Sequence, residues 1–161
     1  MQWHYGCIFC RTGSEESLAS HINGVSDATE AIAPKRLRRK TVGQVVTEDY
    51  VQMLPSYVFF RTVEPTSISH LQRISAVLRI LEYDRSNWEL VGQDRAFAEF
   101  LFGNNLPLCP EIQFIDGRLH FTQDPFLGHD DAVLRVNRKK RTAEVHLNIS
   151  ELTFWISYVE V

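Results

Sequence analysis

The sequence has 161 residues, of which 44% are hydrophobic and 23% charged, and its formal net charge is −3. These values are ordinary for a folded chain of one or two small domains, so they exclude wholesale disorder. No apolar run reaches the length of a membrane-spanning helix, and the first ten residues lack the pattern of a signal peptide. Three cysteines are too few for a disulfide scaffold. We therefore expect a cytoplasmic protein that has no contact with a membrane.

The first two thirds of the chain alternate between strand and helix patterns. Residues 3–10 and 57–60 predict buried strands because they are rich in aromatic and other apolar residues, and residues 31–33 and 77–81 predict shorter strands. Ser14, which two acidic residues follow, predicts the start of a helix.

Two more helices are predicted, one beginning at Ser67 and one capped by Asp94. Residues 35–46 predict a basic hairpin that turns near Gly43. This order has too many strands per helix for a doubly wound parallel sheet. It predicts an α+β fold, with helices packed on a mostly antiparallel sheet.

The pattern changes at residues 104–110, where two prolines and two asparagines predict a linker. Beyond it, alternating apolar residues predict four or five short strands, which is typical of a small antiparallel barrel. We therefore expect one domain in residues 1–103 and a second in residues 111–161.

The charge is distributed unevenly along the chain. Ten of the 17 basic residues lie in two short windows without any acidic residue. They are Lys35, Arg36, Arg38, Arg39, Lys40, Arg135, Arg138, Lys139, Lys140 and Arg141. Such dense like charge is unfavourable unless it is solvated or faces an anion. A solvated loop tip explains one such window, but two windows in an otherwise acidic chain favour contact with a polyanion such as nucleic acid.

Two groups of residues suggest chemistry, and neither is compelling. Cys7 and Cys10 form a CxxC motif, but a zinc site needs a second ligand pair, and residues three apart on a strand point to opposite faces. His129, Asp130 and Asp131 favour a polar turn over a metal or acid–base site. The sequence has no phosphate-binding glycine loop or nucleophile elbow. We expect no catalytic activity, no metal and no cofactor.

Several segments together resemble the NusG family of transcription elongation factors. They are a strand ending in RTG before a helix, PKR before a basic hairpin, MLPSYVFFRT, ISAVLRIL, and a terminal barrel that opens with DPFLG. The most specific segments are residues 34–39, 54–61 and 124–145. The chain is most similar to LoaP-type antiterminators, which share the PKR…RR…G pattern and a hairpin like VNRKKRTAEV. The resemblance implies an N-terminal NGN domain, an α/β sandwich, followed by a KOW domain, an SH3-like barrel of five strands.

The resemblance implies a site for the clamp helices of RNA polymerase on the NGN domain, in an apolar cavity lined by an aromatic strand. The residues at the matching positions are Tyr5, Leu54, Pro55, Tyr57 and Phe59, and Trp3, two residues before Tyr5, is expected to substitute in the same cavity. Tyr57 and Phe59 share one strand face, which we expect to form an exposed groove while the opposite face enters the core. The alternative is that both residues are ordinary core.

The chain departs from the family pattern at several positions. Tyr5 and Gly6 stand where Trp and Tyr are usual, although Trp3 lies on the same strand face as Tyr5. Ser56 and Asp124 each replace a glycine, Ser75-Ala76 replaces a common Pro-Gly, and glycine is the residue that most readily adopts a positive φ.

The resemblance also implies partners for the basic windows. The first would lie near upstream or non-template DNA, and the second would contact nascent RNA, such as a leader hairpin. KOW domains of the family also bind the termination factor Rho or a small-subunit ribosomal protein, and both remain open here. We expect a monomer that suppresses pausing and termination. The alternative is a stand-alone RNA-binding or ribosome-associated KOW protein that never contacts polymerase.

Overall fold

The computed structural model describes residues 2–103, here called the front half, and residues 109–161, the back half. The front half contains β1 (His4–Cys10), α1 (Glu15–Val25), β2 (Thr29–Ile32), β3 (Lys35–Val42), β4 (Val45–Gln52), β5 (Tyr57–Thr62), α2 (Ile68–Gln72), β6 (Val77–Ile80) and α3 (Gly92–Gly103). The back half contains β7 (Glu111–Ile115), β8 (Arg118–Phe121), β9 (Val133–Asn137), β10 (Thr142–His146), β11 (Thr153–Ser157) and β12 (Val159–Glu160). Three short 3-10 helices, Pro65–Ser67, Asp130–Ala132 and Ile149–Glu151, complete it.

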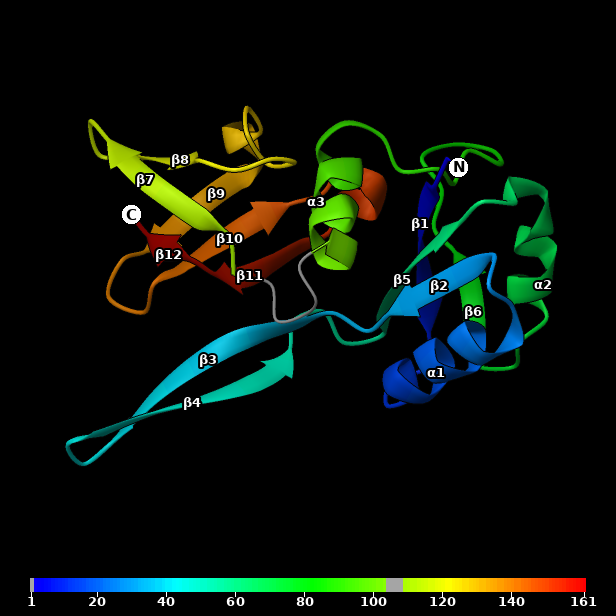
Figure 1. The fold of residues 1–161 in the computed structure, drawn as a ribbon, viewed down its shortest axis with the longest axis horizontal. Coiled ribbons are helices and arrows are strands. Elements are labelled where there is room, and N and C mark those ends of the chain that lie inside the picture. The colour runs from blue at the N-terminus through cyan, green and yellow to red at the C-terminus, as the bar shows by residue number, and fades with distance from the viewer. Residues whose placement is uncertain (1, 104–108) are drawn as a thin grey trace.

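The front half is built on a four-stranded antiparallel sheet with the order β2-β5-β1-β6. Helices α1 and α2 pack on one face of this sheet, and α3 packs on the other (Figure 1). The fold is therefore mixed, with helices on a mostly antiparallel sheet, as the sequence predicts. None of the helices in residues 2–103 or 109–161 is long and apolar enough to cross a membrane.

Both faces of the central strands are buried, which explains why their sequences are almost continuously apolar. Ile8, Val58 and Phe60 pack towards α1 and α2, whereas Cys7 and Phe59 pack towards α3. The alternation expected for residues 57–60 is therefore present, but neither face is left to solvent.

Strands β3 and β4 form a separate two-stranded hairpin, the arm (residues 35–52), which extends from the sheet alongside the back half (Figure 1). Gly43 lies in its turn with φ at 64°, so the predicted turn is confirmed. The return strand continues to Gln52, beyond the predicted end at residue 46.

The back half consists of two three-stranded sheets, with the orders β11-β10-β9 and β12-β7-β8. It has six strands where the resemblance implies five, because the last strand breaks after Ser157 and β12 pairs in parallel with β7. The predicted central hairpin is β9–β10, and its turn is the second basic window. Most of the predicted linker, residues 104–108, lies outside the described residues.

Ser56 and Asp124, two positions where a family glycine is absent, differ in backbone conformation. Ser56 adopts φ at 77°, the conformation for which glycine is the usual choice, whereas Asp124 has no positive φ and precedes a cis proline.

Close packing explains why position 6 is a glycine. A Cβ at this position would lie 2.4 Å from the Phe60 ring and 2.9 Å from Trp88. The stacked Phe60 and Trp88 rings, with centroids 5.4 Å apart, therefore fill the space that a larger residue would need.

Candidate functional site

The structure gathers most of the residues expected to bind polymerase on one face of the front sheet. Trp3, Tyr5, Leu54, Tyr57 and Phe59 all pack in one apolar cluster on the side of α3. They come together because β1 and β5 are adjacent antiparallel strands, with Cys7 opposite Phe59 and Phe9 opposite Tyr57. Pro55 lies exposed in the turn before β5.

The expectation that this face forms an exposed groove is wrong for the arrangement seen here. Phe59 is fully buried, and Tyr5 and Leu54 are 6% and 7% exposed. The Phe59 ring lies 5.3 Å from that of Phe97 on α3, which in turn lies 4.9 Å from that of Phe154 in the back half. Helix α3 and the back half therefore cover the face.

Part of this surface stays accessible at the edges. Tyr57 is half-buried and packs against Phe9, with ring centroids 5.4 Å apart. Trp3 is also half-buried, and the Arg61 guanidinium lies 4.1 Å from its ring centroid. Two aromatic side chains thus remain partly available to a partner while the centre of the face is closed.

We call the contact between α3 and the back half, which includes Phe97 and Asp94, the apolar junction. The buried carboxylate of Asp94 adds hydrogen bonds to it. Asp94 is fully buried and accepts hydrogen bonds from the backbone N–H groups of Asn148 at 2.8 Å and Ile149 at 2.9 Å. It also accepts a hydrogen bond from the Tyr83 hydroxyl at 2.5 Å, and burial together with this hydrogen bond raises the pKa of Tyr83. Asp94 was predicted to cap α3, but α3 begins at Gly92, so its carboxylate is used to bind the back half.

The first basic window is largely neutralised by acidic residues that are distant in the sequence. Arg38 makes two hydrogen bonds to Asp49, directly across the arm, at 2.9 and 2.5 Å. The same strand pairing brings Arg39 to within 3.5 Å of Glu48. Lys40 lies 3.9 Å from Asp49, and Lys35 lies 2.8 Å from Glu16. The hairpin is therefore basic along one strand only.

The second basic window has paired ends and an unpaired tip. Arg135 binds both carboxylate oxygens of Glu144 at 3.0 Å, and Arg138 lies 3.5 Å from Glu160. Lys139, Lys140 and Arg141 are exposed, and they have no ion pair with any described residue. The free positive charge of the back half is concentrated at this turn.

The two windows meet in one hollow, the basic groove, between the arm and the β9–β10–β11 sheet. Its volume is about 470 Å³. Its lining residues are Arg36, Leu37, Arg38, Arg39, Asn137, Lys140, Thr142 and Trp155. The Ser157 hydroxyl donates a short hydrogen bond to the Leu37 carbonyl, which holds the arm against β11. The basic residues that the sequence assigned to separate surfaces thus belong in part to one site.

Sequence reasoning missed Trp155, although a signal was available. On β11 the neighbours Phe154 and Ile156 are buried, so alternation turns Trp155 outward, where it is half-buried. An aromatic residue on the outer face of a barrel strand, close to a basic turn, is a common feature of nucleic-acid sites.

The cysteine motif and the His129–Asp131 segment have structural roles. Cys7 and Cys10 are buried in different clusters on opposite faces of the sheet, so they cannot share one metal ion. Burial raises the pKa of Cys7, and that of Cys10 to about 11, which leaves both thiols protonated at neutral pH. Asp130 accepts the Phe121 backbone N–H at 2.9 Å and lies 2.8 Å from His120, so it anchors β8.

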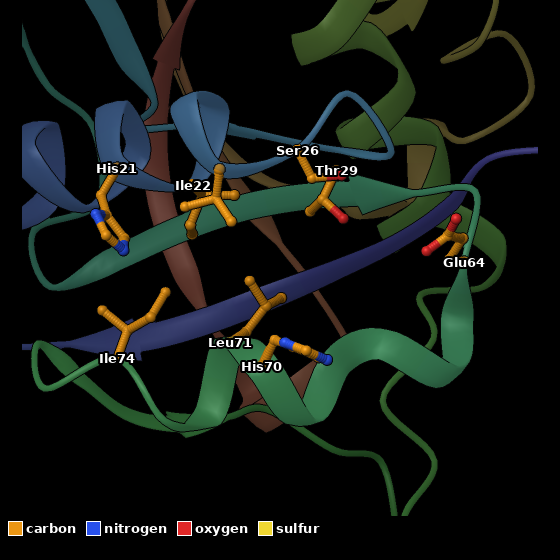
Figure 2. Close-up of a pocket in the computed structure, with 9 residues that line it drawn as sticks. His21, Ile22, Ser26, Thr29, Glu64, His70, Leu71 and Ile74 are labelled. Carbon is orange, nitrogen blue, oxygen red and sulfur yellow. The ribbon is translucent and has the colours of Figure 1, made fainter.

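A second hollow of about 360 Å³ lies between α1 and α2 (Figure 2). Its apolar floor includes Ile22 and Leu71, and His21 and His70 line it from different helices (Figure 2). Within residues 2–103 and 109–161 no three His, Cys, Asp or Glu side chains are placed to hold a metal ion. Ser26, Thr29 and Glu64 add further polar side chains to its lining.

No protein-family model matches the sequence, and no curated protein matches it. Among solved structures, the fold is similar to one described as domain interaction in Thermotoga maritima NusG. The two sequences are 12% identical, the similarity covers 98% of this chain and 94% of that one, and the TM-score is 0.47.

Proposed function

We propose that this protein is a NusG-like transcription elongation factor that acts without catalysis. Residues 1–103 act as an NGN domain that binds the clamp helices of RNA polymerase, and residues 111–161 act as a KOW domain that contacts nascent RNA or a partner protein. Binding to the closed clamp suppresses pausing and termination by favouring the elongating state. A LoaP-type role adds antitermination at particular operons.

One observation carries the proposal. Trp3, Tyr5, Leu54, Tyr57 and Phe59, which the sequence resemblance assigns to the polymerase-binding site, pack on a single face although they come from two segments about fifty residues apart. Aromatic and aliphatic side chains gathered in this way suit an amphipathic helix tip, because they bury a large apolar area at low entropic cost.

The burial of this face has a consequence for the proposed interaction. Phe59 cannot reach a partner while Phe97 of α3 covers it, and Phe97 itself packs against Phe154 of the back half. Full engagement of the clamp helices therefore requires α3 to move off the sheet as well as the back half to leave α3, whereas Tyr57 and Trp3 can make a first contact in the closed arrangement. Part of the free energy of clamp binding is therefore used to separate the back half from α3.

The test is a titration of the isolated clamp-helix hairpin of RNA polymerase into the full chain. Tyr57→Ala is the informative variant, because Tyr57 is half-buried and its loss leaves the buried core in place. We expect Tyr57→Ala to weaken clamp binding at least tenfold, a loss typical of a central aromatic contact. Tyr50→Ala is the control, since Tyr50 is an exposed tyrosine on the arm.

Reconstituted elongation across pause sites and terminators provides the functional measurement. The proposal predicts that the wild-type chain and Tyr50→Ala shorten pauses and that Tyr57→Ala does not. Wild-type clamp affinity in Tyr57→Ala would contradict the proposed site, and unchanged pausing with the wild-type chain would contradict the proposed function.

The alternative, an RNA-binding or ribosome-associated protein that does not contact polymerase, is favoured by the basic groove. It predicts RNA binding without any effect of the clamp helices. The same titration therefore separates the two functions.

A further inference from the structure

We propose that the basic groove is a single composite site for one strand of nucleic acid, with a phosphate against Arg36, Arg39 and Lys140 and a base stacked on Trp155. The proposal concerns the nucleic-acid contact in the closed arrangement, before full engagement of the clamp helices, and does not depend on polymerase binding. It replaces two separate surfaces, one on each half, by one site that both halves build.

The groove contains cations that the protein itself leaves unpaired. Arg36 and Lys140 have no carboxylate of the described residues within ion-pair distance. The Nη1 of Arg39 is buried and has no hydrogen-bond partner among those residues, although its Nε lies 3.5 Å from Glu48. A buried donor without an acceptor is unfavourable, and a turn of the guanidinium towards the groove that Arg39 lines would let an anionic oxygen satisfy it.

Positive charge is crowded on the arm side of the groove. Burial and the nearby charge of Arg38 both lower the pKa of Arg36. Arg38 itself is held by Asp49 across the arm, so its orientation is fixed. Of the three arm arginines, Arg36 alone has no ion pair with a described residue, and a bound phosphate beside it would offset its repulsion from Arg38.

Trp155 distinguishes a nucleotide from a simple anion. Its half-buried ring lines the same groove, and the Arg135 guanidinium lies 5.6 Å from its centroid. Arg135 is fixed by its two bonds to Glu144, the residue opposite Trp155 on β10. The indole is therefore an oriented flat surface beside a phosphate site, which is the combination that binds unstacked bases.

A single strand fits this site better than a duplex. The groove volume of about 470 Å³ lies in the range of ligand pockets and suits about one nucleotide. Bases in a duplex are stacked on each other and cannot stack on a side chain, whereas bases in single strands, loops and bulges can. The occupant we infer is thus a single-stranded segment with one base turned into the groove.

The composite origin of the site links binding to the arrangement of the two halves. Arg36 and Arg39 come from the arm and Lys140 and Trp155 from the back half, so the site exists only when these parts are in contact. A strand bound in the groove consequently stabilises the closed arrangement.

The test measures binding of fluorescein-labelled oligouridine, oligothymidine and a duplex of equal length to the full chain by fluorescence anisotropy, over a series of salt concentrations. Arg36→Ala and Lys140→Ala should each weaken single-strand binding about fivefold to tenfold. Each should also lower the salt-dependence slope by about 0.7, the value for one phosphate contact of a single strand. Arg73→Ala and Arg118→Ala, exposed cations outside the groove on either half, are the controls.

Trp155→Leu should weaken binding about tenfold without changing the salt slope, because it removes stacking and no charge. Trp155→Phe should keep most of the affinity. Thermal unfolding of each variant verifies that the fold is retained.

Three outcomes would overturn the proposal: equal affinity for the duplex, sensitivity to variants on one half only, or an unchanged affinity in Trp155→Leu. Polyglutamate bound as tightly as oligouridine would instead assign the groove to an acidic protein partner. No polymerase is present in these measurements, so their failure leaves the proposed clamp interaction to its own test.

Discussion

The two contacts between the halves of this protein are opposite in character. At the apolar junction the rings of Phe97 and Phe154 are buried together and the Asp94 carboxylate accepts hydrogen bonds from two backbone N–H groups, so these groups find their partners within the chain. At the basic groove, Arg36 and Lys140 lack carboxylate partners among the described residues and the hollow is open. The first contact is complete in itself, whereas the second is complete only with an added anion.

This difference indicates that the two contacts have separate roles, one in stability and the other in ligand binding. The apolar junction supplies the free energy that holds the halves together, because buried aromatic contacts contribute several kcal/mol. The groove adds little to stability on its own, since its charges repel one another. The halves are thus held by one contact, and a ligand site is built at the other.

The largest effect is expected from Phe97→Ala at the apolar junction. Phe97 is 1% exposed and contacts Phe59, Phe126 and Phe154, so its loss should lower the free energy of unfolding by about 3–5 kcal/mol. Chemical denaturation provides the measurement. Tyr50→Ala, which removes an exposed ring from the arm, should change stability by less than about 0.5 kcal/mol. A similar loss in both variants would remove the distinction between the contacts.

A smaller but more specific effect is expected from Asp94→Ala. It leaves the N–H groups of Asn148 and Ile149 and the Tyr83 hydroxyl without their acceptor, at a cost of about 3 kcal/mol. Amide hydrogen exchange at Asn148 and Ile149 should accelerate strongly. Glu99→Ala, which removes the ion pair with Arg95 on the same helix, should leave both amides protected. Protection that survives in Asp94→Ala would show that the carboxylate does not hold the junction.

The smallest effect on stability is expected from Asp49→Asn, which should also strengthen the binding of nucleic acid. This change frees Arg38 and Lys40 from their carboxylate, while the exposed pair contributes little to folding. Binding of oligouridine should tighten severalfold at low salt, and its salt slope should increase. Anisotropy against the wild-type chain is the measurement, and weaker binding would mean that Asp49 positions the groove rather than screens it.

Much of the fold could be predicted from local patterns. The alternation at residues 57–60, the turn at Gly43 and the hairpin formed by β9 and β10 all follow from residues close in sequence. Such features depend on strand periodicity and turn chemistry, which one sequence displays directly.

The burial of the predicted polymerase face could not be predicted in this way. Alternation places Phe59 and Phe154 on inward faces, but it does not say that Phe97 would lie between them. Long-range packing of one apolar surface on another is not encoded in the period of either strand.

The charge of the candidate site was also only partly predictable. The first basic window contains no acidic residue along the chain, yet the arm register places Asp49 opposite Arg38 and Glu48 opposite Arg39. Charge counted along the sequence therefore overstated the charge on the surface. The meeting of both windows beside Trp155 depends on how the arm lies against the back half.

We propose that closing of the two halves covers α3 with the apolar face beneath it and builds the basic groove. Distances between spin labels at Ser20→Cys and Gln113→Cys, exposed positions on the two halves, test it most directly in a Cys109→Ser background. Cys7 and Cys10 are buried and should remain unlabelled.

We predict a narrow distance distribution for the otherwise wild-type chain and a broad one after Asp94→Ala. Added oligouridine should narrow the broad distribution and restore the wild-type distance, because the strand binds only the closed arrangement. A broad distribution that oligouridine leaves unchanged, or moves to longer distances, would contradict the claim.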